Sequence, residues 1–366
     1  MFATIANGYP RGPLPAQPDR LAAAERGVLA GGLTTADLAG ATDAFVREIV
    51  AEQARAGLGF VTDGGVGATD RLSPLIAGLA GLEPAGVTHL PSGEAVTRPR
   101  ATGPIAWTAP ITLDAWSFVA GLTELPAKQV LIGPYTIGRL LDLEGGDPAR
   151  HSLTMALAEA LNGELRALAA AGVPVIQMDE DAATLIGADD AEWARFAMAG
   201  RVLTAGLDDD RVHLSFAALG GAIDPAGHAA ILERPYRSVL FDALAGPEAW
   251  RFALAVPPER GVIAGAVDAH NPTYDEIEVM VWAMAFAAGE GRGQDRAGIA
   301  PNASLTLIDR HYARRKCERM GEAVRIARMG PLADVADALD PDPLHSRMPE
   351  LRALGEAVET ARRGTR

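Results

Sequence analysis

The stretch Val173-Pro-Val-Ile-Gln-Met-Asp-Glu180 shows the pattern on which the fold prediction rests. It is a short, mostly apolar run that directly follows a helix-like segment, 148–171, which ends at Gly172. Such a run predicts a buried strand of a parallel sheet, because helices that connect parallel strands cover both faces of the sheet. Further short runs of this kind occur at 4–7, 58–63, 129–133, 211–216, 238–242, 261–268 and 298–303. Eight such strands with helices between them predict an α/β fold, a single (β/α)₈ barrel of the TIM type.

Two other features define the predicted domain organisation. Two more helical patterns fit the alternation of strands and helices in a barrel. One covers 35–56 and ends at Gly57; the other covers 274–288, with Thr273 as its N-cap. The stretch 73–126 does not fit it, because it is rich in Pro, Gly and Thr. We expect an inserted excursion there, a hairpin near the barrel mouth with 102–107 as an extra strand. The whole chain, 1–366, is predicted to be one domain, with an N-terminal extension, the barrel over about 1–330 and a helical tail over about 331–366.

The composition excludes several classes of partner. Of 366 residues, 48% are hydrophobic, and 47 acidic against 33 basic residues give a net charge of −14. This charge disfavours nucleic acid and anionic membranes as partners. No targeting segment and no uncharged apolar run long enough to cross a membrane is visible. The single cysteine, Cys317, excludes an internal disulfide and any Cys-pair zinc site, and predicts a cytoplasmic location. The oligomeric state stays open.

Polar side chains follow nearly every predicted strand. In α/β barrels the chemistry takes place at the carboxyl ends of the strands. The residues expected there are Asp63, Asp179 with Glu180, His213 with Ser215, Asp242, and Asp268 with His270. We therefore expect a site for a small-molecule substrate at this end of the barrel.

The pair Asp179 and Glu180 is a candidate substrate-binding or base site. Adjacent carboxylates at a strand end can bind an amine or accept a proton. The alternative is that one of them caps the following helix. Capping explains one carboxylate but leaves unexplained why Gln177, a polar residue that needs partners, lies inside a buried strand.

Two histidines are also candidates. Asp268 and His270 are two residues apart at a strand end and so share a face, which suits a carboxylate-oriented general acid or base; the alternative is a hydrogen-bonded turn. His213 and Ser215 have a metal-like spacing, but serine is a poor ligand. The basic segment 312–325, with Arg314, Arg315, Lys316 and Arg319, is interpreted as a solvated helix face.

Taken in order, these motifs resemble the catalytic barrel of cobalamin-independent methionine synthase. The matching motifs are Pro10-Arg11, Gly133-Pro-Tyr-Thr136, 175–180, the strand of His213, Val267-Asp-Ala-His-Asn-Pro272, and Ala300-Pro-Asn-Ala-Ser-Leu305 followed by Ala313-Arg-Arg-Lys316. The resemblance covers most of residues 1–330. It implies methyl transfer from 5-methyltetrahydrofolate to a thiol that zinc holds as a thiolate, with a histidine as the acid.

The resemblance also implies roles for individual residues. His270, oriented by Asp268, is expected to be the acid or base. Asp179, Glu180, Gln177, Asp63 and Arg11 are expected to bind substrate. At the four positions that hold zinc in the family, this sequence has His213, Ser215, Asp242 and Ala303, so both of the family's thiolates are missing. Gly65 stands where the family has a substrate-binding glutamate. We therefore expect no tightly bound zinc.

Three functions remain in competition at this point. The first is a divergent group transferase, folate-linked and without zinc-thiolate activation. The second is a zinc-independent lyase or decarboxylase that uses the same barrel and the same Asp and His residues. The third is a non-catalytic ligand-binding relative, which the retention of Asp179 and His270 disfavours.

Overall fold

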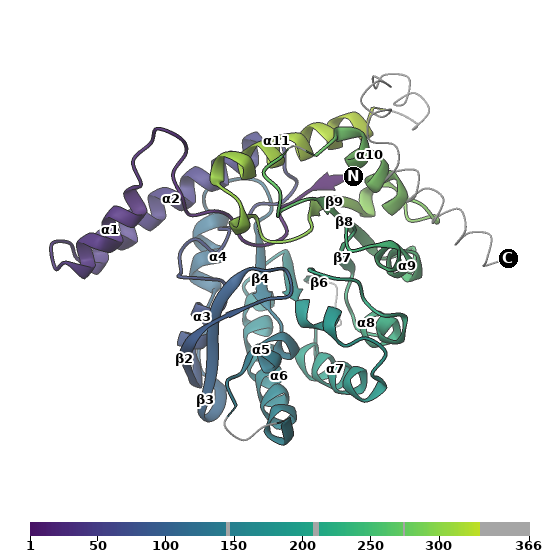
Figure 1. Ribbon diagram of the computed structural model, residues 1–366, viewed down its shortest axis with the longest axis horizontal. Helices are drawn as coiled ribbons and strands as arrows, with labels where there is room; N and C mark the ends of the chain where they lie inside the picture. The colour runs from purple at the N-terminus through teal and green to yellow at the C-terminus, as the bar shows by residue number, and fades with distance from the viewer. Residues whose placement is uncertain (144–146, 208–211, 274, 330–366) are drawn as a thin grey trace.

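The structure, a computed structural model, describes residues 1–143, 147–207, 212–273 and 275–329 (Figure 1). Its centre is a seven-stranded sheet in the order β1-β9-β8-β7-β6-β5-β4, in which every neighbouring pair is parallel. The strands are β1 (Phe2–Ala3), β4 (Lys128–Ile132), β5 (Val175–Asp179), β6 (His213–Ala218), β7 (Ser238–Asp242), β8 (Gly261–Val267) and β9 (Ala297–Pro301). The parallel sheet is thereby confirmed, and six of the eight expected strand regions overlap an observed strand. The strand expected at 4–7 is replaced by β1, which ends at Ala3, so the described residues form a curled seven-stranded sheet and a closed eight-stranded barrel is not confirmed. The tail predicted over 331–366 lies outside the described residues.

The segment 58–63, expected as the eighth strand, is not one. Val61 forms a single parallel bridge with Ala127 beside β4. On its other side, the Gly59 N–H donates to the carbonyl oxygen of Ala3 in β1 at 2.8 Å. The segment therefore lies between the two outer strands of a curled sheet but makes too few ladder bonds to be a strand. Gly57 and Gly64, which flank it, have positive φ angles of 79° and 64° and end the extended backbone on both sides.

Helices connect the strands and cover the outside of the sheet (Figure 1). They are α5 (Pro134–Leu140), α6 (Asp147–Ala170), α7 (Asp190–Leu203), α8 (His228–Leu232), α9 (Pro247–Ala255), α10 (Ile277–Ala287) and α11 (Arg310–Ala327). Near the N-terminus, α1 (Arg20–Leu29) pairs with α2 (Thr35–Arg55), and the pair projects from the sheet. The helices predicted at 35–56 and 148–171 are confirmed. No helix in the described ranges is long and apolar enough to cross a membrane.

The helix predicted at 274–288 begins later than expected, with Glu276 rather than Thr273 as the N-cap. The physical reason is that Asp275 is held in the preceding loop. Its carboxylate accepts hydrogen bonds from the Asp268 N–H at 2.8 Å and from Lys316 Nζ at 2.6 Å. Lys316 is fully buried, so the interpretation of 312–325 as a solvated face was wrong at this residue. Its neighbours Arg314 and Arg315 do remain substantially exposed.

The excursion over 73–126 contains the expected hairpin. Strands β2 (Leu79–His89) and β3 (Ala95–Trp107) pair antiparallel, between α3 (Ser73–Gly78) and α4 (Leu113–Ala120). The hairpin is tied to the barrel at Glu164 of α6, whose carboxylate accepts hydrogen bonds from Trp107 Nε1 and from the backbone of Ile111 and Thr112. Its tip, residues 90–94, reaches the carboxyl-terminal edge of the sheet, where Gly220 approaches Ser92 so closely that a Cβ would lie 2.3 Å from Ser92 N. We call this edge, with the tip over it, the mouth.

Candidate functional site

Asp179 is the centre of a buried hydrogen-bond network at the mouth. It is the last residue of β5, and its side chain is 1% exposed. Oδ1 accepts a hydrogen bond from Gln177 Nε2 at 2.6 Å, and Oδ2 accepts from Asn7 Nδ2 at 2.8 Å and from Arg71 Nη1 at 2.7 Å. Both carboxylate oxygens therefore already have protein partners.

Arg71 links Asp179 to a second carboxylate. Its Nε and Nη2 donate to Glu94 Oε2 at 3.0 and 2.8 Å, and Glu94 Oε1 accepts from Ser304 Oγ at 3.0 Å. Burial opposes the charged guanidinium, but the carboxylates of Glu94 and Asp179 outweigh it and raise the pKa of Arg71. The sequence interpretation missed both Arg71 and Glu94, because neither follows a strand of the barrel. No local signal marks them; only the hairpin insertion brings Glu94 to the mouth.

Gln177 and Lys128 extend the network into the barrel interior. Lys128 Nζ donates to Gln177 Oε1 at 2.8 Å and to the carbonyl oxygens of Ile5 and Ala6 at 2.8 and 3.1 Å. Gln177 thus bridges Lys128 and Asp179, which accounts for a glutamine inside a buried strand. Burial lowers the pKa of Lys128 to about 7, since all three acceptors are neutral.

Glu180 faces a different way from Asp179. Its carboxylate accepts hydrogen bonds from the N–H groups of Tyr135 and Thr136 at 3.1 and 2.7 Å, and from Thr136 Oγ1 at 2.8 Å. It therefore binds the first turn of α5, and a Cβ at Gly133 would lie 2.2 Å from its Cδ. Burial raises the pKa of Glu180 to about 7. The two adjacent carboxylates are thus divided: one lies in the mouth network and the other against α5.

Asp242 and His270 lie on the other side of the mouth. Asp242 Oδ1 accepts hydrogen bonds from the Leu244 N–H at 3.0 Å and from Asn302 Nδ2 at 3.2 Å, and burial raises the pKa of this carboxyl. His270 has a half-exposed side chain, and its Nε2 lies 2.8 Å from the carbonyl oxygen of Ser92 in the hairpin tip. A carbonyl only accepts, so Nε2 carries the proton, and Nδ1 lies 3.6 Å from Asp268 Oδ1.

Asp63 and Arg11 lie at the rim of the mouth. Asp63 Oδ1 accepts hydrogen bonds from the Gly65 N–H at 3.0 Å and from Thr62 Oγ1 at 3.2 Å, and burial raises the pKa of Asp63. Arg11 pairs with Glu25 of α1 at 2.6 Å. A cavity of about 380 Å³ is lined by Arg11 together with Arg71 and Glu94. The structure thus brings Arg11 to the same space as the buried network.

The four positions expected as degenerate zinc ligands do not come together. His213 and Ser215 lie in the first half of β6, because this strand continues to Ala218. The expectation that His213 ends its strand was therefore wrong. Asp242 and Ala303 lie at the mouth. A five-residue strand such as β7 is about 13 Å long, and this length separates the amino-terminal ends of the strands from the mouth. Zinc needs donors at about 2.0–2.3 Å, so these residues do not fit a zinc ion. Within the described ranges, no group of three or more His, Cys, Asp or Glu residues could hold a metal.

Comparisons with known proteins give a family and a fold. The family model described as "Cobalamin-independent synthase, Catalytic domain" matches residues 12–214. A B12-independent methionine synthase from Shewanella sp. W3-18-1, solved with selenomethionine, is similar with a TM-score of 0.73 and 17% identity, over 89% of this chain and 97% of that one. A putative vitamin-B12 independent methionine synthase from Listeria monocytogenes has a TM-score of 0.70 and 15% identity, over 89% of this chain and 97% of that one. A methyltransferase from Methanosarcina mazei has a TM-score of 0.56 and 13% identity, over 89% of this chain and 93% of that one. At these identities the solved structures show a shared fold.

Proposed function

Because the chain belongs to the family of the cobalamin-independent synthase catalytic domain, we propose that it is a methyltransferase that acts on a small-molecule acceptor, with 5-methyltetrahydrofolate as the donor. The observation that carries the proposal is the buried network of Asp179, Arg71 and Glu94 at the mouth, together with His270, which contacts the same hairpin tip that carries Glu94. A rigid set of charges beside a half-exposed histidine is typical of a barrel active site.

His270 is proposed as the general acid. In the transfer, the acceptor forms a bond to the methyl carbon, the bond from that carbon to the donor nitrogen breaks, and the nitrogen keeps the electron pair. A proton on that nitrogen makes it a better leaving group. His270 is placed to supply the proton, since its half-exposed side chain lies at the mouth and its Nδ1 is 3.6 Å from the Asp268 carboxylate, which can orient the ring.

Asp179 is proposed to act on substrate through Arg71. A substrate cation was the expected partner of this carboxylate, but the Arg71 guanidinium occupies the position beside it. The charge of Arg71 is balanced by Asp179 and Glu94, and the same cavity is lined by Arg11, whose buried Nε has no hydrogen-bond partner among the described residues. We therefore propose that the substrate places a carboxylate or another oxyanion near Arg11 and Arg71.

The acceptor is proposed to need no zinc for activation. The candidate donors lie at opposite edges of the sheet, so no step is assigned to the metal. An acceptor that is already acidic, and is therefore a nucleophile at neutral pH, suits a site without a thiolate-forming device.

The test uses the full chain, 5-methyltetrahydrofolate and a panel of small thiol and carbon-acid acceptors. Donor binding is measured by titration calorimetry and turnover by the tetrahydrofolate formed. The proposal expects saturable donor binding and tetrahydrofolate release with at least one acceptor. Absence of donor binding would reject it, and release of carbon dioxide or an elimination product without methyl transfer would instead favour the lyase or decarboxylase alternative.

A further inference from the structure

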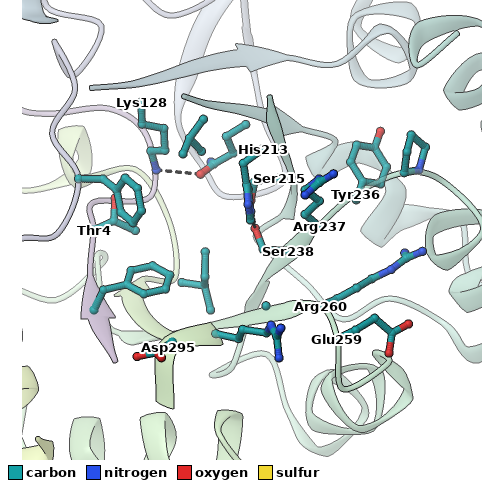
Figure 2. Close-up of a pocket in the computed structure, with 18 of the residues that line it drawn as sticks. Thr4, Lys128, His213, Ser215, Tyr236, Arg237, Ser238, Glu259, Arg260 and Asp295 are labelled. Carbon is teal, nitrogen blue, oxygen red and sulfur yellow. Dashed lines mark hydrogen bonds between the residues drawn. The ribbon is translucent and has the colours of Figure 1, made fainter. Parts of the chain in front are cut away.

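A second cavity lies at the opposite end of the barrel from the mouth (Figure 2). Its volume is about 670 Å³, and it is bordered by the first residues of the strands, including Val175 of β5, Ser238 of β7 and Gly261 of β8. We call it the amino-terminal cavity. Its volume falls within the usual range for ligand sites, about 300–1,000 Å³. In barrels of this kind this end is commonly packed and serves stability.

The inner wall of the amino-terminal cavity is polar where a barrel core is usually apolar. His213 Nε2 lies 2.8 Å from Ser238 Oγ, and Ser238 Oγ lies 2.9 Å from Ser215 Oγ. Burial lowers the pKa of His213 to about 4, so this chain of side chains is neutral at pH 7. Figure 2 shows the three side by side. Barrel interiors are normally filled by branched apolar side chains, so a hydrogen-bonding wall there suits a polar ligand group.

The charges around the amino-terminal cavity favour an anion. Its described lining carries the cations Arg237, Arg260 and Arg296, besides Lys128 with its pKa of about 7, against the carboxylates Glu259 and Asp295. Arg296 and both carboxylates are exposed. This excess of positive charge contrasts with the net charge of −14 of the chain. Arg260 Nη1 is buried and has no hydrogen-bond partner among the described residues. A buried guanidinium donor without a partner is costly, and an oxyanion would satisfy it.

Apolar side chains form part of the remaining lining. Phe2, Phe60 and Ile263 border the same space as the cations. Lys128 and Gln177 also border it and separate it from Asp179, to which Gln177 is hydrogen-bonded. The amino-terminal cavity is therefore distinct from the mouth, although one pair of side chains touches both.

We propose that the amino-terminal cavity binds a small molecule with an apolar body and one oxyanion, a carboxylate or a phosphate, and that Arg260 is its main anion contact. The neutral wall of His213, Ser215 and Ser238 would hydrogen-bond a polar group on the body. This site is independent of the methyl-transfer proposal, because none of its anion contacts lies at the mouth.

The test is titration calorimetry of the full chain with phenyl phosphate, benzoate and, as a neutral comparison, phenol. We expect millimolar or tighter binding of at least one anion and none of phenol; phenyl phosphate against benzoate distinguishes the two oxyanions. Arg260→Met should weaken anion binding about tenfold or more. It should not unfold the chain, because the Nη1 that it removes has no partner in the described residues.

Two matched variants locate the bound anion. Arg251→Met removes an exposed arginine of α9 that pairs with Glu248 and should leave the affinity unchanged. Arg11→Met removes the cation that we place beside the substrate oxyanion at the mouth, so it should affect only binding at the mouth and leave the binding that Arg260→Met weakens. Anion binding lost in Arg11→Met but kept in Arg260→Met would place the anion at the mouth and overturn the proposal. No anion binding, or equal affinity in all variants, would overturn it as well.

Discussion

Arg71 and Asp179 form a buried ion pair between residues 108 positions apart in the sequence. Nη1 lies 2.7 Å from Oδ2, and the two side chains are 8% and 1% exposed. The same guanidinium binds Glu94 of the hairpin tip. The Arg71 guanidinium therefore joins three parts of the chain: β5, the loop that carries Arg71 itself, and the hairpin tip. The geometry of the mouth depends on this cation.

Arg71→Met should be strongly destabilising. It would leave Asp179 and Glu94 buried without their shared cation, and breaking a buried ion pair by removing one partner costs about 3–5 kcal/mol. We expect the free energy of unfolding, measured by urea denaturation, to fall by about this amount. Arg325→Met is the control, because its pair with Glu322 is largely exposed and should change stability by less than about 1 kcal/mol. A small and equal effect of both substitutions would contradict the structural role of Arg71.

His270→Asn should lower kcat about 10²–10⁴-fold with the fold intact, because it removes a positioned acid. The His270 side chain contacts the Ser92 carbonyl oxygen and lies near Asp268, so its loss should change the melting temperature little. His311→Asn, a substitution of an exposed histidine on α11, is the control and should keep full turnover. Turnover per folded molecule that stays unchanged in His270→Asn would show that this histidine only holds the loops together.

Gly220→Ala should displace the hairpin tip. Gly220 has a φ of +81°, and a Cβ there would lie 2.3 Å from Ser92 N, in the backbone that also carries the acceptor of His270. Gly206→Ala is matched in φ, at +73°, but its Cβ would meet no atom within 4 Å. Both variants should pay about 1 kcal/mol for the backbone conformation. Only Gly220→Ala should also lower turnover and increase proteolysis of the hairpin; identical behaviour of the two would mean that the close approach is unimportant.

Lys128 should contribute a rise in stability with pH between about 7 and 10.5. Burial lowers the pKa of Lys128 from 10.5 to about 7. Between these values the unfolded chain binds a proton that the folded chain does not, so the free energy of unfolding rises by up to about 1.4 kcal/mol per pH unit. Lys128→Met should lack this contribution. Urea denaturation at several pH values gives the difference between the two proteins; parallel curves would show that folding leaves the pKa of this lysine unchanged.

The purified protein should retain no stoichiometric zinc after dialysis against a chelator. His213 and Asp242 lie at opposite edges of the sheet, and Ser215 and Ala303 supply no thiolate. Elemental analysis by mass spectrometry checks this. One zinc per chain that survives the chelator would show that ligands other than these four hold the metal.

Local signals were sufficient for most of the fold. The predicted range 238–242 coincides with β7, and Gly57 and Gly172 follow α2 and α6 as expected. Apolar runs and helix-stopping glycines report on burial and backbone conformation, which a short stretch of sequence largely fixes. The segment 58–63 has the composition of a strand, but whether it forms ladder bonds depends on both neighbours, which the sequence does not show.

Residue types and their spacing were enough to predict which polar residues stand near strand ends, and Asp179, Asp242 and His270 do lie at the mouth. Which of these groups contact one another depends on tertiary packing. The side chain of Asp179 faces Arg71 while its neighbour Glu180 faces α5, and His213 lies at the amino-terminal end because β6 continues beyond it. These outcomes depend on where each strand begins and ends and on the inserted hairpin. They follow from packing between segments far apart in the chain, which no local pattern encodes.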